Sequence, residues 1–194
     1  IYEELNPKTG KVGKIEFDKV NGKIENITNM PGRFSVNPFI DINVSSNFLN
    51  TVPLEAKFRF DMSRVNNGVF SVDAVLGKIN GNTLNQITEP LALVKVNSLE
   101  VKKFTAHIDG TDNNATGKIS FDYKDLNIDI LKKKDDGKMK KRGFLTFLAN
   151  KFVIKKNGPQ PVKEKTVHYE RDPQRSFFNL IWKTMLAGIK ETVK

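Results

Sequence analysis

The chain of 194 residues contains no cysteine, only two histidines and a single tryptophan. The absence of cysteine excludes a disulfide scaffold, a thiol nucleophile and a cysteine-ligated metal site. The longest apolar runs fall far short of the ~20 residues that a membrane-spanning helix requires. We therefore expect a soluble or peripheral chain. Because the sequence opens at Ile1 without a methionine, we also expect a piece of a longer protein, which leaves room for a signal peptide or anchor ahead of it.

Motifs for catalysis are equally scarce. His107 and His168 lie on separate predicted strands, and neither has a serine or an acid at a spacing that would support catalysis. The sequence contains no Walker loop, no dinucleotide-binding glycine turn and no nucleophile elbow. Residues 109–114 carry oxygen donors like a calcium loop, but they lack the closing glutamate of an EF-hand and are better explained as a turn. We expect no catalytic residue, no metal and no cofactor.

The positive charge is confined to the last third of the chain. Residues 1–131 hold 15 Lys/Arg and 16 Asp/Glu, a net charge of −1, whereas residues 132–194 hold 17 and 6, a net charge of +11. Such asymmetry indicates an anionic partner for one end of the molecule.

The first two thirds have the pattern of β-strands. Residues 52–62 alternate almost throughout between apolar and polar side chains, which is typical of a strand with one dry and one wet face. The same period recurs around residues 40–44, 70–76, 119–123 and 126–130, and more loosely at 15–17 and 104–108. Turn signals separate these runs, at Asn21-Gly22, 66–68, 109–110 and 112–114. The pattern predicts a meandering antiparallel sheet.

Two segments interrupt or follow the strands with helical spacing. Residues 82–94 predict a short helical plug on the apolar face, which Pro90 should kink or divide. Residues 173–193 predict a C-terminal amphipathic helix, opened by Asp172 and Pro173, with an apolar stripe through Phe178, Trp182, Met185 and Ile189. Between them we expect a mobile basic loop at 132–142, a short helix at 144–149, and strands at 152–154 and 166–170.

The basic loop and the last helix each allow more than one interpretation. The loop can be a solvated linker, or its lysines can meet an anionic membrane surface or nucleic acid. Nucleic acid is disfavoured because the sheet half offers no extended basic platform. The helical stripe can close one end of the sheet, or it can dock on a bilayer or a partner through Trp182 and nearby lysines.

Several segments together resemble the AsmA-like family, which is related to the TamB and bridge-like lipid-transfer group. Residues 14–27 resemble the family's strand that runs into a glycine followed by spaced isoleucines, and residues 117–126 resemble its strand near the C-terminus. Residues 142–149 resemble the short helix after a basic loop, and Phe177-Phe-Asn-Leu-Ile-Trp182 resembles the start of its last helix.

This resemblance implies a fold, a location and a role. AsmA-like proteins are anchored in the inner membrane of Gram-negative bacteria and extend through the periplasm as a curved, taco-like β-groove. The concave apolar face of that groove is thought to carry the acyl chains of phospholipids for outer-membrane biogenesis. The resemblance transfers no individual ligand residue, because the family holds lipid through generic apolar surface.

We therefore expect one mainly β domain over 1–194 with flanking helices (α+β): a sheet meander over 1–131 with a helical insert at 82–94, the basic loop 132–142, and a capping segment 143–194. The sheet would be long, curved and antiparallel, forming an open groove or half-barrel. The leading hypothesis is a non-enzymatic, periplasmic lipid-binding or lipid-transfer module of an inner-membrane-anchored protein, with phospholipid or another acyl-chain ligand and the membrane surface as partners. The candidate groove residues are Val52, Leu54, Phe58, Phe60, Phe70, Val72, Ile119 and Phe121, and the candidate headgroup or membrane contacts are Lys138, Lys140, Lys141, Arg142 and Trp182.

Two alternatives stay open beside the lipid hypothesis. The chain can be a structural β-module, closed internally, that binds an envelope protein through its basic C-terminal end. Less favoured is a nucleic-acid-binding domain that depends on residues 138–142.

Overall fold

The computed structural model describes residues 1–7, 10–133, 139–141 and 154–194. The strands are β1 (Tyr2–Asn6), β2 (Lys11–Ile15), β3 (Phe17–Glu25), β4 (Phe39–Phe48), β5 (Val52–Asp61), β6 (Phe70–Leu76), β7 (Ile79–Asn80), β8 (Val94–Gly110), β9 (Asn114–Lys133), β10 (Met139–Lys141) and β11 (Lys165–Glu170). The helices are α1 (Pro31–Phe34), α2 (Asn85–Ala92) and α4 (Phe177–Val193), with 3₁₀ turns η1 (Met62–Asn67) and η2 (Gly81–Leu84).

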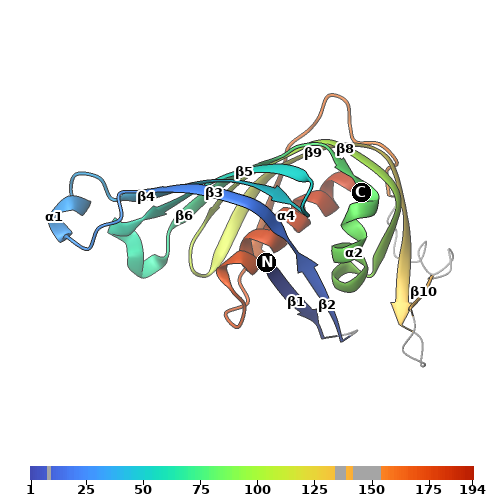
Figure 1. Cartoon of the computed structure of the whole chain (residues 1–194), viewed down its shortest axis with the longest axis horizontal. Coiled ribbons are helices and arrows are strands. Elements are labelled where there is room, and N and C mark those ends of the chain that lie inside the picture. The colour runs from blue at the N-terminus through green and yellow to red at the C-terminus, as the bar shows by residue number, and fades with distance from the viewer. Residues whose placement is uncertain (8–9, 134–138, 142–153) are drawn as a thin grey trace.

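The strands form one long antiparallel sheet and a separate hairpin. In the sheet the order is β10-β9-β8-β6-β5-β4-β3, β11 pairs with β9, and β7 pairs with β8, whereas β1 and β2 form a two-stranded sheet of their own. The long sheet arches and does not close on itself (Figure 1). The predicted fold class is confirmed: the chain is mainly β, with a long open antiparallel sheet and a C-terminal helix.

The register places the alternating apolar residues in rows across the strands. Phe58 of β5 lies opposite Val72 of β6, and Val72 lies opposite Ile108 of β8. In the next rows Ala56, Ala74 and Ala106 are neighbours, as are Leu54, Leu76 and Phe104. Because side chains in a strand alternate between faces, these rows gather on one face and leave the polar residues on the other.

Strands β8 and β9 are longer than the sequence predicts. The pairing of β8 with β9 shifts register at three places, between Val96 and Ser98, between Ser98 and Glu100, and between Val101 and Lys103. In β9, Asp125 has a φ of 56°, and it separates the two runs predicted as distinct strands. Extra residues at such bulges change the phase of the alternation without ending the strand.

Other predictions about elements need correction. Asn21-Gly22 is not a turn but lies inside β3, beside a register shift between Asp18 and Asn21. The predicted insert 82–94 is a 3₁₀ turn followed by α2, and Val94 already belongs to β8. The predicted basic loop is part strand, because β9 extends to Lys133 and β10 pairs with its end. The strand predicted at 166–170 is confirmed as β11.

The last helix begins later than predicted. Asp172 accepts a hydrogen bond from the backbone N–H of Gln174 and forms a turn, whereas the hydroxyl of Ser176 accepts one from the N–H of Asn179 and caps α4. The helix therefore starts at Phe177 rather than at 173. The helix predicted at 144–149 and most of the strand predicted at 152–154 lie outside the described residues, and Ile154 is not in a strand.

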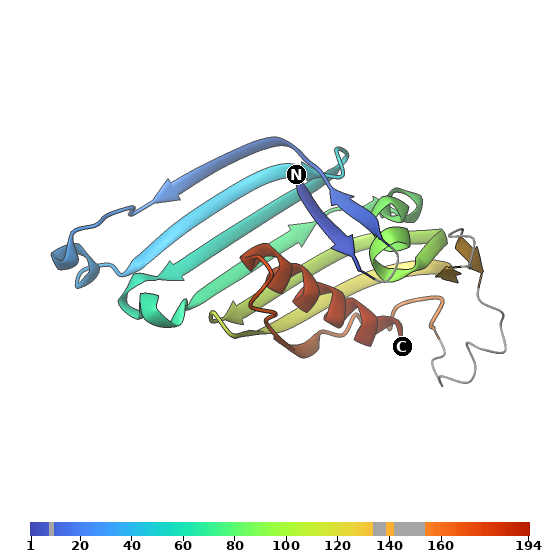
Figure 2. The ribbon, with the colours of Figure 1, turned by 90° about the horizontal axis from the view of Figure 1, so that it is seen from below.

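Helix α4 lies under the arch of the sheet, and α2 lies near one end of the arch. The β1–β2 hairpin lies between α4 and α2 (Figures 1 and 2). Helix α4 packs against β9 and β11 through the buried residues Leu180, Thr184, Gly188 and Thr192, which are spaced four apart. Two glycines permit this close approach: a Cβ on Gly117 would lie 2.7 Å from Thr184 Cγ2, and a Cβ on Gly188 would overlap Ile119. The stripe that contains Thr184 and Gly188, rather than the aromatic one, therefore faces β9 and β11.

Candidate apolar ligand pocket

An apolar pocket of about 340 Å³ lies between the concave face of the sheet and the helices. Among the described residues that line it, all but Thr88 and Lys190 are apolar or aromatic. Sheet residues in its wall include Leu54, Phe58, Val72, Phe104, Phe121 and Ile128. The volume falls in the range of roughly 300–1,000 Å³ that is usual for small-molecule sites.

Small side chains make the floor of the pocket hollow. Ala56 of β5 and Ala74 of β6 lie directly opposite each other and both line the pocket. On the flanking rows stand the larger side chains of Leu54 and Phe58. A row of alanines between rows of leucine and phenylalanine leaves a depression that the protein's own side chains do not fill.

The aromatic stripe of α4 forms one wall. Phe178, Trp182, Met185 and Ile189, the stripe that the sequence predicts, all line the pocket. Because the helix contacts β9 through the stripe that contains Gly188, its aromatic stripe lies on a different side and borders the pocket. The indole N–H of Trp182 is buried and meets no acceptor among the described residues.

The N-terminal hairpin and α2 form the opposite wall. Ile87 and Leu91 of α2 line the pocket together with Ile15 of β2, which is fully buried. A Cβ on Gly13 would overlap Leu91, and the side-chain amide of Asn6 donates a hydrogen bond of 2.8 Å to the carbonyl of Pro90. The hairpin is thus fixed tightly to α2.

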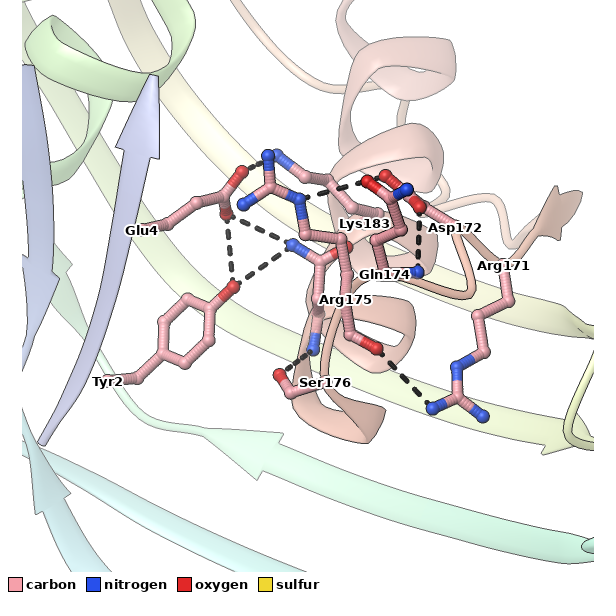
Figure 3. Close-up of polar contacts among 9 residues, drawn as sticks. Tyr2, Glu4, Arg171, Asp172, Gln174, Arg175, Ser176 and Lys183 are labelled. Atoms are coloured by element: carbon pink, nitrogen blue, oxygen red, sulfur yellow. Dashed lines mark hydrogen bonds and ion pairs between the residues drawn. The ribbon is translucent and has the colours of Figure 1, made fainter. Parts of the chain in front are cut away.

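A polar cluster joins the same hairpin to α4 (Figure 3). Glu4 forms an ion pair with Lys183 at 2.7 Å and accepts a hydrogen bond from the hydroxyl of Tyr2 at 3.1 Å. The amide of Asn179 donates to both Tyr2 and Glu4, at 3.0 and 3.3 Å. Desolvation is the main cause that raises the pKa of Tyr2. We name Tyr2, Glu4, Asn179 and Lys183 the hairpin latch, because these residues hold the hairpin across the groove.

The structure separates the predicted groove residues into two groups. Leu54, Phe58, Val72 and Phe121 line the pocket, whereas Val52, Phe60, Phe70 and Ile119 do not. Val52 and Ile119 are buried in the core, and Ile119 lies beneath Gly188. Phe60 and Phe70 pack on Phe177, with ring centroids 5.7 and 4.7 Å apart.

The predicted headgroup contacts are dispersed. Trp182 lies in the pocket wall. Lys140 and Lys141 belong to β10, where the register places Lys140 opposite Lys132 and Lys141 opposite Leu131. Lys138 and Arg142 lie outside the described residues.

Sequence reasoning missed two parts of the site. The walls from the hairpin and from α2 include Ile15 and Leu91, whose contact depends on pairing between distant segments. Lys190, which also lies in the wall, is not among the contact residues that the sequence predicts. The signal in the sequence that could have identified Lys190 is its position directly after Ile189 of the apolar stripe, which places it at the border of that stripe.

The outer face of the sheet carries paired charges. Arg59 donates two hydrogen bonds to Asp41, at 2.8 and 3.0 Å, which lowers the pKa of Asp41. His107 lies between Asp73 at 2.6 Å and Asp109 at 3.1 Å, and its hydrogen bond with Asp73 is the main cause that raises its pKa. Within the described ranges, no group of three or more acidic or histidine side chains could hold a metal ion.

No helix in the described part of the chain is long and apolar enough to cross a bilayer. Comparison of the chain with protein-family models, with curated proteins and with solved structures finds no match.

Proposed function

We propose that the chain is a non-enzymatic lipid-binding module that holds acyl chains against the concave face of its sheet. The observation that carries this proposal is the pocket between the sheet, α2 and α4, whose described wall is apolar at every position except Thr88 and Lys190. An apolar hollow of this kind favours hydrocarbon over polar ligands, because burying hydrocarbon costs no hydrogen bonds.

Further support comes from the way the pocket is maintained. Large side chains such as Trp182 and Phe121 surround a floor of alanines, and the hairpin latch keeps the opposite wall in place. A core formed only for stability would be expected to fill such a hollow, since empty apolar volume is destabilising.

In the same proposal the chain is part of a longer, AsmA-like envelope protein, located in the periplasm and involved in lipid supply to the outer membrane. The resemblance of residues 14–27, 117–126 and 177–182 supports this placement. The open arch of the sheet (Figure 1) is the shape that such a role requires.

The test is lipid extraction from the purified protein, followed by transfer of a labelled lipid between vesicles. The protein is expected to carry and transfer lipid, and Phe58→Asp is expected to abolish both because it places a charge in the pocket wall. Val75→Asp is the matched control, since Val75 is 40% exposed on the outer face of the adjacent strand. A folded protein without bound or transferred lipid would contradict the proposal and favour a structural module.

A further inference from the structure

Lys190 is the one charged side chain among the described residues that line the pocket. It stands in the last turn of α4, next to Ile189, and is also open to solvent. A residue that both lines the pocket and reaches solvent marks the mouth of the pocket. Long lysine side chains can lie along apolar surface with the ammonium group kept near water.

The ammonium group of Lys190 has no counterion among the residues that the structure describes. The other lysines of α4 are paired, Lys183 with Glu4 at 2.7 Å and Lys194 with Glu191. No residue in the described part of the chain forms an ion pair with Lys190. Although part of the side chain is exposed, burial of the rest is the largest cause that lowers its pKa, followed by the charges of Lys183 and Lys194.

The size of the pocket restricts the hydrocarbon that it can take. Its volume of about 340 Å³ is near the lower end of the range of roughly 300–1,000 Å³ found for ligand sites. Such a space suits one acyl chain better than the two chains of a phospholipid.

We propose that the pocket holds a single-chain amphiphile with an anionic headgroup, whose chain lies between Phe121 and Trp182 and whose headgroup oxygens bind Lys190. A carboxylate and a phosphate monoester share this chemistry. Either accepts charge-assisted hydrogen bonds from an ammonium group. This inference rests on the proposed function, because it requires that the pocket takes hydrocarbon.

The experiment is displacement of N-phenyl-1-naphthylamine, an uncharged fluorescent probe, from the pocket. The competitors share a twelve-carbon chain: dodecanoic acid, dodecyl phosphate, dodecanol and dodecylammonium. Displacement of the probe is expected to show that both anions bind about tenfold more tightly than dodecanol, since a hydrogen bond to a charged group is worth ~1.5–3 kcal/mol. Dodecylammonium is expected to be the weakest. Comparison of the two anions then distinguishes the carboxylate from the phosphate.

Lys190→Gln is expected to remove the preference for anions while dodecanol binds as before. Lys194→Gln is the matched control: it removes the same charge from the same end of α4, at a residue that does not line the pocket. A two-chain phosphatidic acid should compete at least tenfold more weakly than its one-chain lyso form.

The possible outcomes distinguish a failure of this inference from a failure of the proposed lipid-binding function. If none of the amphiphiles displaces the probe, the proposed function itself fails. The inference is overturned if all four amphiphiles displace the probe equally, or if Lys190→Gln and Lys194→Gln have the same effect. In either case the pocket takes lipid, but Lys190 does not bind the headgroup. Equal or tighter binding of the two-chain lipid would overturn the single-chain assignment.

Discussion

Gly188 of α4 lies directly on Ile119 of β9. The two are so close that a β-carbon at position 188 would overlap Cβ and Cγ1 of Ile119. This contact sets the depth at which the helix lies on the sheet. It also determines which face of the helix is left to line the pocket, because Phe178, Trp182 and Met185 project from another side of the same turns.

Gly188→Ala is expected to destabilise the protein. Overpacking costs about 1–3 kcal/mol and exceeds the gain of up to about 1 kcal/mol that alanine brings to a helix. Urea unfolding followed by circular dichroism measures the effect. Gly32→Ala in α1 is the control, since a Cβ there meets nothing within 4 Å; equal stability of the two variants would show that the close contact is not rigid.

The hairpin latch is expected to be a coupled unit. Glu4 and Lys183 have side chains only 11% and 22% exposed, so a double-mutant cycle with Glu4→Gln and Lys183→Met should give a coupling free energy of about 0.5–3 kcal/mol. The exposed pair of Lys23 and Glu25 serves as the comparison and should give about 0–1 kcal/mol. Similar values for both pairs would show that the latch contributes no more than a surface ion pair.

Filling the floor of the pocket is expected to block ligand binding without unfolding the sheet. Ala56→Trp places an indole into the hollow opposite Ala74, whereas Glu55→Trp places one on the outer face of the same strand. Probe fluorescence titrations should show at least a tenfold loss of affinity for Ala56→Trp, and little change for Glu55→Trp. Unchanged affinity of Ala56→Trp would place the binding site elsewhere.

His107 is expected to stabilise the protein more at low pH than at high pH. Its folded-state pKa is raised, chiefly by the hydrogen bond with Asp73. The stabilisation is therefore fully present below the unfolded value of about 6.5 and is lost as the pH rises through the folded value. An NMR titration should give a pKa above that of a free histidine, and Asp73→Asn should lower it.

The control for this titration is the pH dependence of unfolding. His107→Gln should remove the part of the stability that declines above about pH 6.5. A titration of His107 at the ordinary value in the wild-type protein would refute the assignment.

The central sheet was predictable because β5 and β6 alternate between apolar and polar residues almost throughout, and of the apolar residues in β6 Val75 alone falls on the outer face. The length of β8 was not, because three register shifts interrupt its alternation between Val96 and Lys103. A bulge changes the apparent period while the backbone pairing continues, and a single sequence does not distinguish this from the end of a strand.

The orientation of the last helix was also beyond reach of its amphipathic pattern. That pattern identifies Trp182 and Met185 as an apolar face, but such a face can equally cover a sheet or line a pocket. The deciding signal was the second stripe, through Thr184 and Gly188, because only small residues allow the helix to lie this close to β9. The β1–β2 hairpin was missed since its role depends on contacts with residues near the other end of the chain.

The contact between Tyr2 and Asn179 joins residues 177 positions apart, whereas β4, β5 and β6 pair with their neighbours in sequence. Closing so long a loop is entropically costly, so local hairpins are expected to form before the ends of the described chain meet. Amide exchange should accordingly be faster in β1 and α4 than in β5 and β6. The sheet would then exist first as an uncovered apolar arch, and the binding pocket would be the last part of the molecule to be assembled.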